Sequence, residues 1–126
     1  MLTGVLAAAL LLTGCAAGSG AAASCVGPTV AVQPGQARAG ERVTVSVEWL
    51  HEGCADTVPG QDDERPATAA VVFEQVGTTT VLGHVTGEGD HFTGRTTVSV
   101  PADATPGAAS ITLDRSAATA DLTVLP

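Results

Sequence analysis

Alternating apolar and polar positions run through the chain from Pro28 onward and predict β-strands. The clearest run is Glu41–Trp49. Its apolar positions share one face and its polar positions the other, as in a strand with one buried side: Val43, Val45, Val47 and Trp49 against Arg42, Thr44, Ser46 and Glu48. Six further runs are separated by Gly, Pro and Asp: Thr29–Gln33, Ala69–Gln75, Thr79–Val85, Phe92–Val100, Ala109–Leu113 and Ala118–Leu125.

The number and length of these runs predict the architecture. About seven strands in about 100 residues indicate an all-β sandwich. With Trp49, Phe73 and Phe92 as the aromatic residues, the core must consist mostly of Val, Leu, Ile and Ala. In two of the later strands the expected inward sets are Phe92, Thr96, Val98 and Val100, and Ala120, Leu122 and Val124.

The segment before the domain has the pattern of an export signal. Val5–Leu12 is an apolar run of eight residues, too short for a membrane-spanning helix but suited to a signal peptide. It leads into Leu12-Thr13-Gly14-Cys15, which resembles the lipobox of bacterial lipoproteins. The resemblance implies cleavage after residue 14 and a Cys15 that carries two acyl chains such as palmitate. This lipid would anchor the protein at the outer face of the cytoplasmic membrane.

The prediction therefore divides the chain into three parts. Residues 1–14 are the signal peptide, residues 15–27 a lipid-anchored flexible tether, and residues 28–126 the sandwich domain. Ala16–Ser24 consists of small residues with nothing to bury, which is typical of a flexible spacer.

Two further cysteines are expected to form a disulfide. With Cys15 acylated, Cys25 and Cys54 remain as an even pair in an exported protein. Closing a loop of about 30 residues would contribute about 3–4 kcal/mol in the chain-entropy model. A redox-active or metal-binding thiol pair is the alternative, but the close C-x-x-C spacing is absent.

The domain resembles immunoglobulin-like domains of actinobacterial surface proteins. The motifs that carry the resemblance are Pro34-Gly35 followed by Gly40-Glu-Arg-Val-Thr-Val, the hairpin sequence Leu82–Gly94, and Val98-Ser-Val-Pro-Ala-Asp-Ala-Thr-Pro-Gly. They cover most of Thr29 to Pro126 and are turn and strand-end signals. The resemblance implies an immunoglobulin-like fold and leaves the activity open, since this fold carries no fixed function.

Charge excludes one class of function. The chain has 5 basic residues, all of them Arg, and 13 acidic residues, for a net charge of −8. Nucleic-acid binding is not expected, because it requires basic side chains that displace phosphate counterions. An enzyme is not expected either, since neither G-x-S-x-G nor a Ser close in sequence to a His occurs.

Two segments are candidates for metal binding. If Gly87–Asp90 forms a four-residue turn, Thr86 pairs with His91 and His84 with Thr93, which places both histidines on one face about 7 Å apart. Glu88 and Asp90 would lie between them, as further ligands for zinc or copper; a solvated polar hairpin is the alternative. The irregular loop Ala55–Pro66 offers carboxylates for calcium, without the spacing of a calcium loop: Asp56, Asp62, Asp63 and Glu64. A partner-binding loop is the alternative there.

The sequence as a whole predicts a non-enzymatic, lipid-anchored module without a cofactor, which binds or spaces something at the cell envelope. Its expected partners are the membrane, through the anchor, and a protein of the envelope. One alternative is a small metal-binding lipoprotein that uses His84 and His91. Another is an accessory subunit of a membrane complex.

Overall fold

The computed structural model describes residues 26–53 and 65–126, and within them all regular elements are β-strands. The strands are β1 (Thr29–Gln33), β2 (Gln36–Arg38), β3 (Arg42–Glu48), β4 (His51–Glu52), β5 (Arg65–Pro66), β6 (Thr68–Gln75), β7 (Thr78–Thr86), β8 (Gly94–Ser99), β9 (Gly107–Leu113) and β10 (Thr119–Leu125). Over these two ranges, no helix of the length and apolarity needed to cross a membrane is found.

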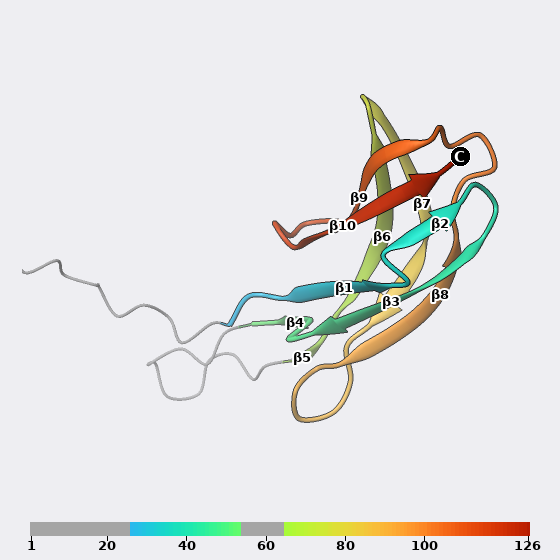
Figure 1. Ribbon diagram of the computed structural model, residues 1–126. Helices are drawn as coiled ribbons and strands as arrows, with labels where there is room; N and C mark the ends of the chain where they lie inside the picture. The colour runs from blue at the N-terminus through green and yellow to red at the C-terminus, as the bar shows by residue number, and fades with distance from the viewer. Residues whose placement is uncertain (1–25, 54–64) are drawn as a thin grey trace, which may run out of the picture.

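The strands form two main sheets (Figure 1). A three-stranded sheet has the order β1-β3-β8, and a five-stranded sheet has the order β2-β10-β9-β6-β7. The chain passes from one sheet to the other between β1 and β2, between β2 and β3, between β3 and β6, between β7 and β8, and between β8 and β9. β4 and β5 pair separately as a short hairpin. The predicted all-β sandwich is therefore confirmed.

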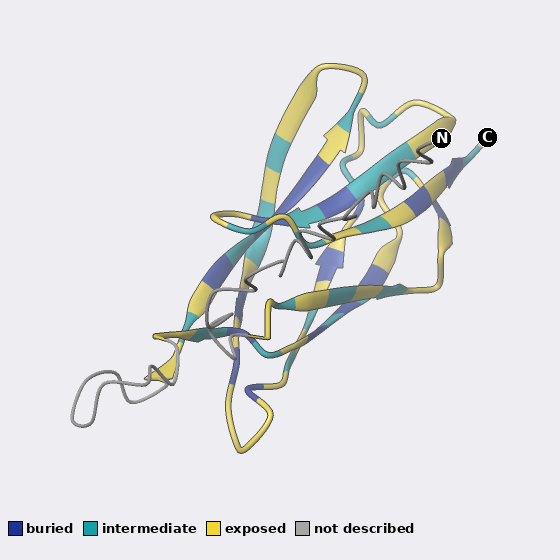
Figure 2. Ribbon diagram, turned by 90° about the vertical axis from the view of Figure 1, so that its left-hand side faces the viewer, coloured by how far each residue is buried: buried dark blue, intermediate teal, exposed yellow. Residues whose placement is uncertain are grey.

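The core lies between the two sheets and follows from the alternation of the sequence. In β3, Val43, Val45 and Val47 are buried and the residues between them face outward. Buried and exposed positions alternate in the same way along most strands (Figure 2). From the facing sheet, the largest side chains that fill the core are Phe73, Ile111, Leu113 and Leu122. Hydrophobic burial between the sheets is thus the main stabilising term.

The seven predicted strands all correspond to observed ones, with ends that differ by up to two residues. The strands not predicted are β2, β4 and β5, which contain two or three residues each. Such short segments cannot show a period, because their pairing depends on neighbours that are distant in sequence. Arg65 and Pro66, predicted as the end of the irregular loop, form β5.

The expected burial of Trp49 is wrong. β3 ends at Glu48, and Trp49 adopts a left-handed backbone conformation with φ of 59°. This turn breaks the alternation, so that Trp49 is only half-buried and Leu50 enters the core, with 6% of its surface exposed.

The strand predicted to begin at Phe92 begins at Gly94 instead. Phe92 belongs to the preceding turn and also has a positive φ, 48°. It is nevertheless buried, as are Val98 and Val100, whereas Thr96 is half-buried. In β10, Leu122 and Val124 are buried as expected, with Ala120 half-buried.

Candidate functional site: a histidine and aromatic cluster at one end of the sandwich

Histidine and aromatic side chains gather at the end of the sandwich where β1 begins. The chain contains three aromatic residues and three histidines, and two of each lie here: Trp49, Phe92, His51 and His91. Trp49 follows β3, whose last residue, Glu48, pairs with Thr29, the first residue of β1. We call these four side chains the histidine–aromatic cluster.

Backbone hydrogen bonds hold the two halves of the cluster together. The Trp49 N–H donates to the carbonyl oxygen of His91 at 2.8 Å, and the Leu50 N–H donates to that of Phe92 at 3.1 Å. The turn before β8 is thereby fastened to the end of β3. The two donors, Trp49 and Leu50, lie between the end of β3 and the start of β4, directly before His51.

The side chains stack in two pairs across this contact. The ring centroids of Trp49 and His91 are 5.0 Å apart, and those of His51 and Phe92 are 4.9 Å apart. The His51 Nδ1 also lies 2.8 Å from the carbonyl oxygen of Gly53. Contacts at these distances are favourable for aromatic rings.

Positive φ at Trp49 and Phe92 is unusual, because bulky side chains rarely adopt the left-handed region. Strained backbone of this kind persists only where the surrounding contacts require it, and it is concentrated at functional sites. Here the ring pairs and the two hydrogen bonds supply those contacts. The strain therefore marks the cluster as a candidate site.

The chemistry available at this end suits binding. His91 is exposed and Trp49 half-exposed, so that a flat apolar surface lies next to an imidazole that can donate or accept a hydrogen bond. Beside them, Pro28, Leu50, His51 and Arg115 line part of a hollow of about 210 Å³. Arg65 and Glu52, 4.0 Å apart, form an exposed ion pair on the β4–β5 hairpin.

The predicted arrangement of the metal-site candidates is wrong. The turn is Gly89–Phe92, closed by Glu88 and Thr93, which exchange two backbone hydrogen bonds of 2.8 and 2.9 Å. It lies two residues later than predicted, because Phe92 turns inward to pack against His51 and its carbonyl accepts the Leu50 N–H. His84 accordingly pairs with Ala70 in the five-stranded sheet and not with Thr93.

The structure does not bring the four predicted metal ligands together in one site. His84, Glu88, Asp90 and His91 are all exposed, with His84 on a sheet and the others in or beside the turn. Within residues 26–53 and 65–126, no three His, Cys, Asp or Glu side chains are grouped so that they could hold a metal ion. The other predicted site residues lie outside the described residues: Cys15, Cys25, Cys54, Asp56, Asp62, Asp63 and Glu64.

The sequence pattern predicted Trp49 and Phe92 only as strand or core residues and placed His51 in no site. The available signal was the crowding of rare side chains, Trp49-Leu-His51 and His91-Phe92, in two short segments. What the sequence did not reveal was the turn that brings the two segments together.

Comparison of the chain with protein-family models, with curated proteins and with solved structures gives no match. The class defined by the structure is that of an all-β sandwich with a histidine–aromatic cluster at one end.

Replacing His91 with alanine is expected to lower the free energy of unfolding by about 0.5–1.5 kcal/mol and to increase quenching of tryptophan emission by acrylamide. Trp49 is the single tryptophan of the chain, so its emission reports on this contact directly. His84→Ala is the matched control, because His84 is exposed on the sheet. Equal quenching in both variants would show that His91 does not cover the indole.

Proposed function

We propose that this protein is a lipid-anchored, extracytoplasmic immunoglobulin-like module that binds or spaces a partner at the cell envelope and is not an enzyme. The observation that carries the proposal is the apolar run Val5–Leu12 leading directly into Leu12-Thr13-Gly14-Cys15. An acyl-modified Cys15 with two chains gives durable membrane attachment, which one chain does not. The sandwich domain supplies a stable scaffold that presents surfaces at its two ends.

A disulfide between Cys25 and Cys54 belongs to the proposal. Its support is the position of two described residues that lie three and two residues from the cysteines in sequence. Pro28 and Glu52 line the same hollow at the cluster end of the sandwich. Chain segments that enter and leave at one place can be joined without distorting the sheets, which disulfide geometry requires.

The entry point of the chain also gives the domain an orientation. Because β1 starts beside the histidine–aromatic cluster, an anchor before β1 would turn this end toward the membrane. The β6–β7 turn lies at the opposite end of the sandwich and would then face away from the membrane (Figure 1).

Replacing Cys15 with alanine is expected to abolish lipid attachment and to release the protein from the membrane fraction. The measurement is the intact mass of protein extracted from membranes of the cells that make it, before and after reduction. The unsubstituted protein should have the mass of residues 15–126 plus acyl groups, and it should gain two hydrogens on reduction.

The matched control is the double variant Cys25→Ala/Cys54→Ala. It should keep the acyl groups and lose the change in mass on reduction. An unlipidated protein that still begins before Cys15 would overturn the anchor, whereas an unchanged mass on reduction would overturn only the disulfide.

A further inference from the structure

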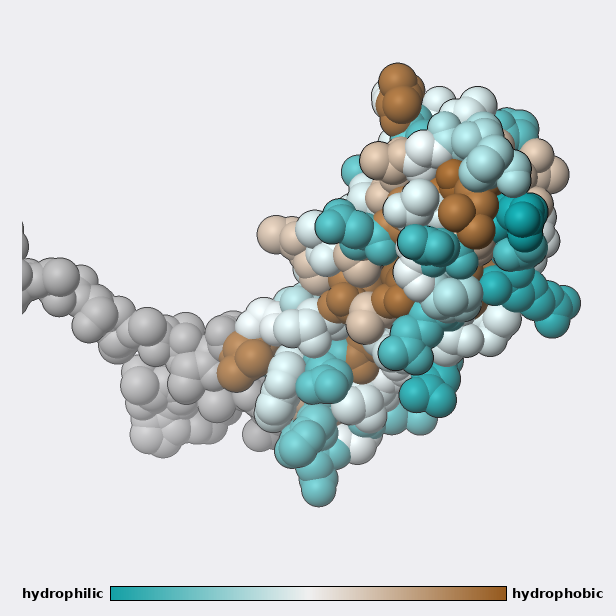
Figure 3. Space-filling model, viewed as in Figure 1, coloured by the Kyte–Doolittle hydropathy of each residue, from teal (hydrophilic) through white to brown (hydrophobic). Residues whose placement is uncertain are grey.

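Val76, at the tip of the β6–β7 hairpin, is the most exposed large apolar residue in the part of the chain that the structure describes. Its exposed fraction is 94%. Val76 and Gly77 form a two-residue turn closed by the pair Gln75 and Thr78, and both turn residues have positive φ, 38° and 74°. In Figure 3 hydrophobic surface protrudes at this end of the molecule.

A valine is unfavourable at this position for two reasons. Two-residue hairpin turns with positive φ favour Asn, Asp or Gly, because a β-branched side chain is strained there. Full exposure also leaves the side chain without any gain from burial. Neither turn geometry nor core packing therefore accounts for a valine at this position.

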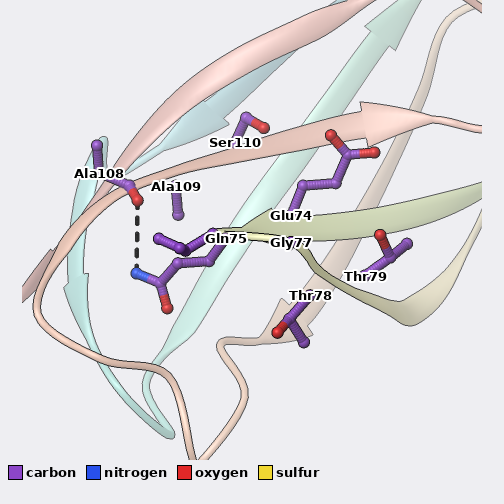
Figure 4. Close-up of a pocket in the computed structure, with 9 residues that line it drawn as sticks. Glu74, Gln75, Gly77, Thr78, Thr79, Ala108, Ala109 and Ser110 are labelled. Carbon is purple, nitrogen blue, oxygen red and sulfur yellow. Dashed lines mark hydrogen bonds between the residues drawn. The ribbon is translucent and has the colours of Figure 1, made fainter.

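Hydrogen bonds of the Gln75 side chain fix the base of this turn. The Gln75 Nε2 donates to the carbonyl oxygen of Thr105 at 2.7 Å, and the Gln75 Oε1 accepts from the Thr105 N–H at 3.0 Å. The Nε2 also lies 3.5 Å from the carbonyl oxygen of Ala108 (Figure 4). These bonds tie the hairpin to the segment that connects β8 and β9. A contact residue on a fixed base loses little conformational entropy on binding.

Two open hollows flank the tip, and both carry negative charge. One, of about 490 Å³, lies between the turn and β9 and is shown in Figure 4. The other, of about 260 Å³, lies toward the Pro101–Thr105 segment. Gln75, Val76 and Thr78 line both, and the charged side chains that line them are Glu74 in the first and Asp103 in the second. The tip is thus an apolar projection with an acidic border.

We propose that the β6–β7 tip is a docking site for a protein that presents an apolar pocket bordered by Lys and Arg side chains. Val76 fills the pocket, and Glu74 and Asp103 face the basic border. Charge complementarity selects this occupant. A second copy of a chain with net charge −8, or an anionic lipid surface, would meet the acidic border with repulsion. The site goes beyond the proposed function and does not depend on the lipid anchor.

The experiment places a photo-crosslinking amino acid, benzoylphenylalanine, at Thr78 of the full chain in the cells that make it. Thr78 lines both hollows, and Thr119, exposed at the start of β10, is the control position. We expect a discrete protein adduct from position 78 and none from position 119. Val76→Asn, which suits the turn, should reduce the adduct about tenfold, and Glu74→Gln/Asp103→Asn should reduce it without touching Val76.

The outcomes separate the possible occupants. An adduct that is lost in both variants and weakened by added salt supports the docking site. No adduct, an adduct with phospholipid or with a second copy of the chain, or an adduct unchanged by Val76→Asn overturns it. Thermal unfolding of the Val76→Asn variant shows whether the fold is retained, and the charge variant decides if it is not. Failure of the anchor would appear separately, as the same adduct in the soluble fraction.

Discussion

Replacing Phe73 with alanine is expected to lower the free energy of unfolding by about 3–5 kcal/mol. Phe73 lies on β6 of the five-stranded sheet, opposite Thr80 on β7 and Ile111 on β9, and only 2% of its surface is exposed. Most of the surrounding core consists of valines, which cannot move far enough to fill the cavity. Urea denaturation followed by Trp49 emission measures the loss.

Two controls separate a cavity effect from a general effect of substitution. Phe73→Leu removes less volume and should cost less than Phe73→Ala. Val81→Ala, on the exposed surface of β7 with an exposed fraction of 58%, should change stability by less than about 0.5 kcal/mol. If Phe73→Ala resembles Val81→Ala, the core is not organised around Phe73.

A loss of this size matters because a domain of this length has about 5–15 kcal/mol of stability in total. The core contains two buried rings, Phe73 on β6 and Phe92 in the turn at the cluster end, and its other members are aliphatic. The proposed Cys25–Cys54 disulfide would add about 3–4 kcal/mol by the chain-entropy model. In the double variant that lacks both cysteines, Phe73→Ala should therefore leave a smaller free energy of unfolding than it leaves in the protein with the disulfide.

The strands could be predicted because the signal for them is local. In β3 the alternation of valines with polar residues is enough to fix which face is buried, and Val43, Val45 and Val47 are inward as expected. The two-residue strand β4 had no such signal, since only its pairing with β5 defines it.

The candidate site could not be predicted because it depends on two backbone reversals. Gly87 to Asp90 has the composition of a turn, yet the turn lies at Gly89–Phe92. Its unexpected residue is Phe92, whose backbone has a positive φ. Contacts with Leu50 and His51, some forty residues away in sequence, stabilise that conformation and override local preference. The same holds for Trp49, whose backbone turns where the alternation predicts a continued strand.

Replacing Gly87 with alanine is expected to lower the free energy of unfolding by about 1–3 kcal/mol, the usual cost of overpacking, and to loosen the cluster. Gly87 is buried where the Leu50 segment and the Gly89–Phe92 turn meet, and its N–H donates to the carbonyl oxygen of Ala67. An added Cβ would lie 2.6 Å from the Phe92 carbonyl oxygen and 2.9 Å from the Leu50 Cβ, so the backbone must move. Because the Leu50–Phe92 hydrogen bond neighbours the Trp49–His91 contact, Trp49 should become easier to quench as well. Gly35→Ala, where an added Cβ meets nothing within 4 Å, is the control. If Gly87→Ala and Gly35→Ala have the same stability and the same quenching, the close approach of the turn to Leu50 is not what holds the cluster together.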